Sequence, residues 1–166
     1  MNNYRDRLIV LVFEFLKECI KINGISRISI IGSLATIKEH PKDADILLNI
    51  ADDLELKYLA KISRRLQGKT GELNSGADIF VADLNNKYLG RICHWKDCRF
   101  GVRQRCDALN CGKRQYLHDD LNTITLKKEL IDYPPLEIYP NLIKRIEVPN
   151  DLKDELISKF EIYKLS

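Results

Sequence analysis

Residues 30–50 read IIGSLATIKEHPKDADILLNI, in which one apolar run ends at Gly32-Ser33 and a second begins after nine further, mostly polar residues. The second run is apolar toward both faces from Ala44 to Ile50, which is typical of a buried β-strand. Asp43 and Asp45 lie at its start, and buried carboxylates cost stability unless positive charge meets them. The stretch therefore predicts a buried strand with a cation beside its first residues.

The spacing of apolar residues predicts helices and strands on both sides of this stretch. The predicted helices cover 5–22, 54–66 and about 151–163, and the predicted strands cover 25–31, 44–50 and 77–84. Asp52 or Asp53 is expected to cap the second helix, and Gly68 to stop it. Asn150 or Asp151 is expected to cap the third. Together these elements predict an α+β fold, with a small mixed β-sheet and helices packed on one side.

The chain length of 166 residues suggests one domain, residues 1–166, in three parts. These are a core at about 5–92, a basic Cys-rich excursion at 93–120, and a C-terminal extension and helix at 121–166. No apolar run is long enough to span a bilayer, and the run at 8–13 leads into charged residues without a cleavage site. We therefore expect a cytoplasmic protein without a membrane partner.

Basic charge gathers in residues 87–114, where eight Lys and Arg stand against Asp97 and Asp107, although the whole chain carries a net charge of only +3. Such clustering indicates a polyanionic partner, either nucleic acid or a triphosphate. A solvated basic face is the alternative.

Asp43 and Asp45 are two residues apart in a strand, so both side chains point to one face. Paired carboxylates are ligands that suit Mg²⁺. Gly32-Ser33 offers exposed backbone N–H groups and a hydroxyl to phosphate oxygens, and the short helix expected after it adds its positive end. Asp78, within the strand predicted over 77–84, is placed to supply a third carboxylate. Phosphate beside metal is the arrangement that phosphoryl or nucleotidyl transfer needs.

Ile31-Gly32-Ser33, nine residues and Asp43-Ala44-Asp45-Ile46 resemble the signature of the DNA polymerase β-like nucleotidyltransferases. That signature is an apolar residue, Gly, Gly or Ser, nine to thirteen residues, and then acid, apolar, acid, apolar. The resemblance covers residues 25 to about 84. It implies that Gly32 and Ser33 bind the nucleoside triphosphate, that Asp43 and Asp45 bind two Mg²⁺ ions, and that Asp78 activates the acceptor hydroxyl.

The loop after Gly-Ser departs from many small members of that family, which carry arginines there. Lys38 and Lys42 are its only cations; Lys42 is therefore assigned to nucleotide binding, with Lys61, Arg64 or Arg65 as further candidates for the triphosphate grip. The structural alternative for the two aspartates is a strand-edge pair capped by Lys42 and solvent. Asp83 is a rival for the third carboxylate, but its spacing from Asp78 turns it to the opposite face.

Four cysteines, Cys93, Cys98, Cys106 and Cys111, follow in a C-x4-C-x7-C-x4-C pattern, with His94 and His118 as spare ligands. Two such pairs can hold a structural Zn²⁺, and reduced, partly buried thiols are the alternative. The segment from Cys93 to Asp120 also resembles one found in bacterial nucleotidyltransferases without an assigned substrate.

Aromatic residues alternate with the basic residues of this segment, so they are candidates to stack on bases or, alternatively, to form a small satellite core: Trp95, Phe100 and Tyr116. His118-Asp119-Asp120 is interpreted as a turn rather than a metal cluster.

These residues predict a Mg²⁺-dependent nucleotidyltransferase that takes an NTP such as ATP as its donor. Its acceptor would be RNA, protein or a small molecule. One alternative is a non-catalytic nucleic-acid-binding module with a zinc-bearing basic segment. Another is a component of a toxin–antitoxin or defence pair that works with a protein partner.

Overall fold

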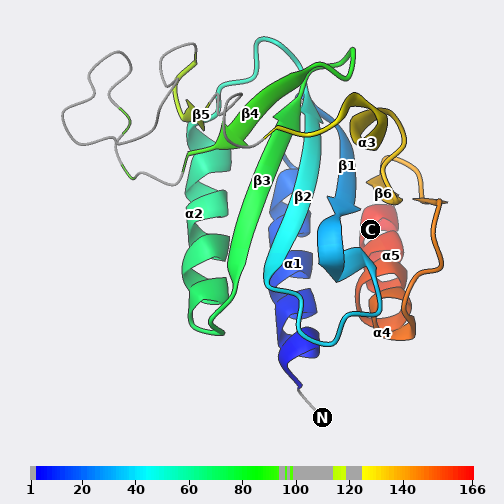
Figure 1. Cartoon of the computed structure of the whole chain (residues 1–166). Coiled ribbons are helices and arrows are strands. Elements are labelled where there is room, and N and C mark those ends of the chain that lie inside the picture. The colour runs from blue at the N-terminus through cyan, green and yellow to red at the C-terminus, as the bar shows by residue number, and fades with distance from the viewer. Residues whose placement is uncertain (1–2, 94–95, 97, 99–113, 119–124) are drawn as a thin grey trace.

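The computed structural model describes residues 3–93, 96, 98, 114–118 and 125–166 (Figure 1). The fold is α+β, as predicted. Its elements in chain order are α1 (Tyr4–Cys19), β1 (Ile25–Ile31), the 3-10 turn η1 (Gly32–Ala35), β2 (Asp43–Ile50), α2 (Lys57–Gly71), β3 (Gly76–Ala82), β4 (Tyr88–Ile92), β5 (Leu117–His118), α3 (Lys128–Asp132), β6 (Leu136–Tyr139), β7 (Ile143–Lys144), α4 (Asn150–Leu152), the π-helical turn η2 (Lys153–Ile157) and α5 (Ser158–Leu165).

The described strands form one mixed sheet in the order β5-β4-β3-β2-β1-β6-β7, so β2 lies at its centre. β2 pairs with β3 in parallel and with β1 in antiparallel orientation. Every β2 residue from Ile46 to Ile50 is buried, which confirms the prediction of a buried strand. A central position explains why both faces of this strand are apolar, since each face is covered by other residues.

The larger core lies between one face of the sheet and the long helices. Figure 1 shows these helices running alongside the strands. α1 packs against α2 on one side and against η2 and α5 on the other. Ile46 and Ile79 point from the sheet into this core, together with Leu8 of α1 and Leu59 of α2. The long helices therefore lie on one side, as expected.

A second, smaller core lies on the opposite face of the sheet. Ile31, Leu47, Phe80 and Ala82 gather there with Ile131 of the short helix α3. α3 was not predicted from the sequence. It covers the middle of this face and leaves the starts of β2 and β3 outside the cluster.

Two boundary predictions for the second helix are wrong. α2 begins at Lys57, and Leu56 precedes it without a side-chain cap, so neither Asp52 nor Asp53 caps it. The helix continues through Gly68 to Gly71. Among the described residues, no helix combines the length and the apolar character needed to cross a membrane.

Candidate active site

Three carboxylates meet where β2 and β3 begin. The parallel register places Asp45 beside Asp78, and Asp43 beside Gly76. Ligand oxygens of Asp43, Asp45 and Asp78 all lie within 4.8 Å of one another. Ala44 and Ile46 point into the helix-side core, so by strand alternation the three aspartates lie on the opposite face, that of α3.

Two glycines make room for these carboxylates. A Cβ on Gly32 would lie 2.3 Å from Oδ2 of Asp45, and a Cβ on Gly76 would lie 2.4 Å from Oδ1 of Asp43. Gly32 also has φ +72°, a conformation that side-chain-bearing residues rarely adopt. The backbone therefore closely lines the carboxylate cluster at two glycines. The sequence singled out Gly32 for phosphate binding only, and nothing in it pointed to Gly76.

The cluster concentrates negative charge that the described protein offsets only in part. Burial, followed by the charges of Asp78 and Asp43, raises the pKa of Asp45 from 3.8 to about 7. Burial also raises the pKa of Asp78, although the nearby Arg91 guanidinium opposes the shift. Arg91 Nη1 of β4 donates to Asp78 Oδ1 at 3.4 Å. By sequence, Arg91 is one of the eight cations of residues 87–114, and its position beside Asp78 follows only from the β3–β4 register.

The donor set fits a hard divalent cation such as Mg²⁺. Three carboxylates converge within a space that two glycines keep open, and these oxygen donors are of the type that Mg²⁺ selects. A bound cation would also relieve the repulsion that raises the pKa of Asp45. Asp43, Asp45 and Asp78 are therefore the residues that would hold it.

The predicted phosphate residues lie next to this cluster. Ile31 pairs with Asp45 across β1 and β2, so Gly32 follows directly beside the carboxylates. Gly32 is exposed, and the Ser33 carbonyl accepts hydrogen bonds from Thr36 N and Thr36 Oγ1 at 3.1 and 2.7 Å. Lys42, directly before Asp43, is exposed, so its ammonium is free to approach a phosphate in this region.

The basic residues of α2, which were further candidates for the triphosphate grip, lie away from this site. α2 packs on the helix-side core through Leu59 and Ile62, away from the carboxylate face. Arg65 lines a crevice together with two glutamates of α1. Lys61 and Arg64 line a separate pocket of about 380 Å³ with Lys57 and Lys96.

Asp83, the rival third carboxylate, lies beyond the end of β3. Its Oδ1 accepts hydrogen bonds from the backbone N–H groups of Asn85 and Lys87, at 2.8 and 2.9 Å. Asp83 therefore shapes the turn into β4, and Asp78 alone contributes from β3 to the cluster.

The four-cysteine prediction reaches the described residues only at Cys93 and Cys98. Cys93 is buried, and Cys98 Sγ accepts a hydrogen bond from Tyr116 N at 3.4 Å. The other residues named for this segment lie outside the described part of the chain: His94, Trp95, Phe100, Cys106, Cys111, Asp119 and Asp120. Across the described ranges, the aspartate cluster is the one group of three or more possible ligands within 4.8 Å, so the zinc site stays a prediction.

The structure thus brings the predicted metal and phosphate residues to one end of the central strand: Gly32, Ser33, Lys42, Asp43, Asp45 and Asp78. Comparisons of the chain with protein-family models, with curated proteins and with solved structures gave no match.

Proposed function

We propose that the protein is a metal-dependent nucleotidyltransferase, which transfers a nucleoside monophosphate from an NTP to an acceptor hydroxyl and releases pyrophosphate. The observation that carries this proposal is the convergence of Asp43, Asp45 and Asp78 beside the Gly32-Ser33 turn. Carboxylates and phosphate-binding backbone are then neighbours on one face of the sheet. The signature resemblance described above supports the same activity.

In the proposed reaction, the acceptor oxygen attacks the α-phosphorus, and the bond from that phosphorus to the pyrophosphate oxygen breaks. Asp78 takes the proton of the acceptor hydroxyl, a role that suits a carboxylate whose pKa is raised by burial. Gly32 and Ser33 hold the β- and γ-phosphates through backbone N–H groups and a hydroxyl. Lys42, directly before Asp43, and Arg91, beside Asp78, add positive charge near the cluster. Bound Mg²⁺ supplies charge neutralisation at the phosphates.

Label transfer tests the proposal. Purified protein is incubated with each α-labelled NTP, Mg²⁺ and a total cell extract, beside Asp45→Asn and the matched control Asp83→Asn. We expect wild type and Asp83→Asn to label an extract component, and Asp45→Asn to lose about 10²-fold or more of that transfer, because a cation ligand is removed. Transfer by Asp45→Asn at the wild-type rate, or none by wild type with any NTP, would refute the proposal.

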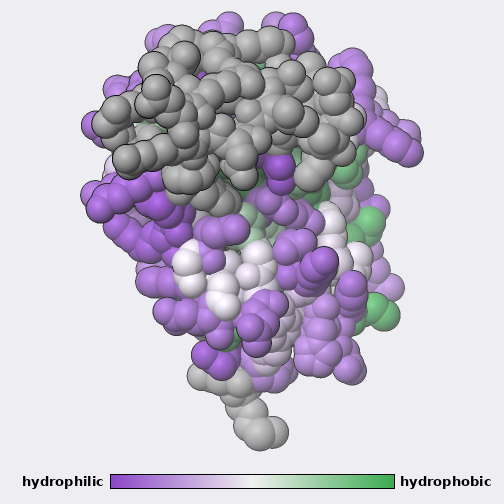
Figure 2. Space-filling model, turned by 60° about the vertical axis from the view of Figure 1, so that its left-hand side comes forward, coloured by the Kyte–Doolittle hydropathy of each residue, from purple (hydrophilic) through white to green (hydrophobic). Residues whose placement is uncertain are grey.

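A second candidate function, nucleic-acid binding without catalysis, is favoured by one specific observation. The pocket beside α2 is lined by Lys57, Lys61, Arg64 and Lys96 against the single acid Glu55, with Tyr58 and Tyr116 at its wall. In Figure 2, hydrophilic residues cover much of the coloured surface on this side of the molecule. Salt-sensitive RNA binding by a protein with no NTP affinity would favour this function over the transferase.

A further inference from the structure

The loop at 34–42 links the phosphate residues to the first metal ligand, yet it buries little of itself. Residues 36–40 are all exposed, with Ile37 at 83%. Only Leu34, Ala35 and Pro41 are buried. Because burial of apolar surface is the main force that fixes a chain segment, this loop needs other interactions to keep one conformation.

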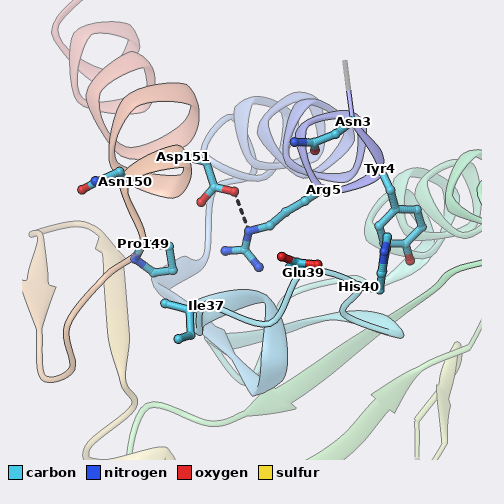
Figure 3. Close-up of a pocket in the computed structure, with 9 residues that line it drawn as sticks. All are labelled: Asn3, Tyr4, Arg5, Ile37, Glu39, His40, Pro149, Asn150 and Asp151. Carbon is cyan, nitrogen blue, oxygen red and sulfur yellow. Dashed lines mark hydrogen bonds and ion pairs between the residues drawn. The ribbon is translucent and has the colours of Figure 1, made fainter. Parts of the chain in front are cut away.

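Arg5 supplies such interactions from the first turn of α1. Its side chain is only 7% exposed, and it donates from Nη2 to the Leu34 carbonyl and from Nη1 to the Lys38 carbonyl, each at 2.9 Å. Its Nε donates to Asp151 Oδ2 at 2.5 Å. Figure 3 shows the guanidinium reaching from α1 toward Asp151, beside the loop residues Ile37 and Glu39. One planar group thus joins the N-terminal helix, the loop and the C-terminal helical run.

Further contacts hold the last residues of the loop. Tyr4 Oη donates to the Pro41 carbonyl at 2.8 Å, and its ring lies edge-on to His40 with the ring centroids 5.3 Å apart. From the other side, Ser75 Oγ and Gly76 N donate to the Lys42 carbonyl at 2.8 and 3.2 Å. Carbonyls at both ends and in the middle of the loop are therefore fixed from outside it.

We propose that Arg5, oriented by Asp151, is a positioning residue that holds this loop so that Gly32-Ser33 and Asp43 keep their places at the site. The proposal rests on the proposed function only where it concerns the nucleotide. The need for a guanidinium follows from the geometry, because its fork reaches two carbonyls and a carboxylate at once, whereas a lysine ammonium on a flexible stem cannot match that planar arrangement. Asp151 has a corresponding part, since it takes up the charge that allows the arginine to be buried.

Arg5→Lys tests the proposal, with the exposed Arg7→Lys on the same helix as its control. We expect amide hydrogen exchange in 34–42 to rise about tenfold in Arg5→Lys, as the loss of one or two net hydrogen bonds implies, and to stay unchanged in β2 and α2. The Kd for Mn²⁺, used as the probe of the carboxylate cluster, should rise several-fold. Where transfer is measured, the KM for NTP should rise more than kcat falls. Arg7→Lys should match wild type in every measurement.

Tyr4→Phe serves as a second variant, because it removes one hydroxyl and keeps the ring. It should speed exchange near Pro41 without altering exchange near Leu34. Unchanged loop exchange in Arg5→Lys, or exchange that rises equally across the whole chain, would overturn the proposal in favour of a general structural role. Exchange and Mn²⁺ binding need no transfer, so absence of nucleotidyl transfer in wild type would refute the function and leave the test of Arg5 intact.

Discussion

At the scale of single residues, Gly32 shows how closely backbone and carboxylate approach at the site. Gly32→Ala would place a methyl group 2.3 Å from Oδ2 of Asp45 and would force alanine to φ +72°. We expect a loss of about 1–3 kcal/mol in the free energy of unfolding. We also expect Mn²⁺ binding to be lost, because the Asp45 carboxylate must move.

Gly68→Ala is the control for this prediction. A Cβ at Gly68 meets nothing within 4 Å, and the residue lies inside α2, so alanine should stabilise the protein by about 0.5–1 kcal/mol. Urea denaturation and Mn²⁺ titration of both variants give the two readouts. Wild-type Mn²⁺ affinity in Gly32→Ala would contradict the placement of Gly32 against Asp45.

The raised pKa of Asp45 predicts how the stability of the protein depends on pH. Because its pKa rises from 3.8 unfolded to about 7 folded, the folded chain binds more protons within that window. The free energy of unfolding contributed by this group therefore falls as pH rises from about 4 to about 7 and stays low above that range. Divalent cations compete with the proton, so Mg²⁺ should stabilise the protein more at about pH 8 than at about pH 5, with affinity falling by up to about tenfold per pH unit below 7.

Asp45→Asn checks this prediction by urea denaturation at both pH values, with and without Mg²⁺. The variant should be more stable than wild type at the higher pH without metal, and Mg²⁺ should no longer stabilise it. The prediction would be contradicted if the free energy of unfolding of wild type rose from about pH 4 to about pH 7 with the same slope as that of Asp45→Asn. Ionisation of Asp45 would then not destabilise the folded protein.

Some site residues could be predicted from the sequence and others could not. The difference lies in how far along the chain their partners are. Asp43 and Asp45 are neighbours in one strand, so their shared face follows from alternation alone. Gly76 and Arg91 reach the cluster only through the β2–β3 and β3–β4 registers, which no local pattern specifies. Arg5 lies still farther from its partners, since Asp151 is 146 residues away. Its position in an amphipathic helix would ordinarily indicate a solvated side chain.

At the scale of elements, strand patterns were informative and helix ends were not. The central strand followed from its apolar faces, whereas the start of α2 at Lys57 did not, because neither Asp52 nor Asp53 acts as a cap. α3 is only five residues long, too short for a helical period to show in the sequence. Its place is fixed by tertiary packing, since Ile131 is 1% exposed between the side chains of the second core.

Tertiary contacts also decide how the C-terminal helical run, α4 to α5, begins. Asn150 or Asp151 is the cap that the sequence predicts, yet no side-chain cap precedes α4, and the carboxylate of Asp151 pairs with Arg5. A short acidic residue near a helix start is suited to either task, so only the arrival of a cation from α1 decides between them. Helix boundaries were thus least predictable where a residue near the helix end bonds to a different element.

At the scale of the whole molecule, opposite charges occupy different surfaces. The carboxylate cluster lies on the α3 face of the sheet, whereas the pocket with Lys57, Lys61 and Lys96 lies beside α2, which packs on the other face. Separation of this kind suits a protein that binds a metal-bound nucleotide at one place and the backbone of a nucleic-acid partner at another. β2 and β3 lie between the two surfaces and contribute residues to both cores.

This arrangement predicts that the pocket binds RNA independently of the carboxylates. Lys57→Glu with Lys61→Glu should weaken binding of single-stranded RNA at least about tenfold and reduce its salt dependence, since two cationic contacts are reversed. Lys127→Glu with Lys144→Glu is the control, because both residues are exposed, neither lines the pocket, and the net charge changes by the same amount. Filter binding across a salt series, with Mn²⁺ affinity measured in parallel, separates the outcomes.

If both pairs of substitutions weaken RNA binding equally, the loss of affinity comes from the change in net charge and not from the pocket. If only the first pair loses RNA affinity and its Mn²⁺ affinity is unchanged, the carboxylate cluster is still intact. RNA would then be the first acceptor to test in the transferase reaction.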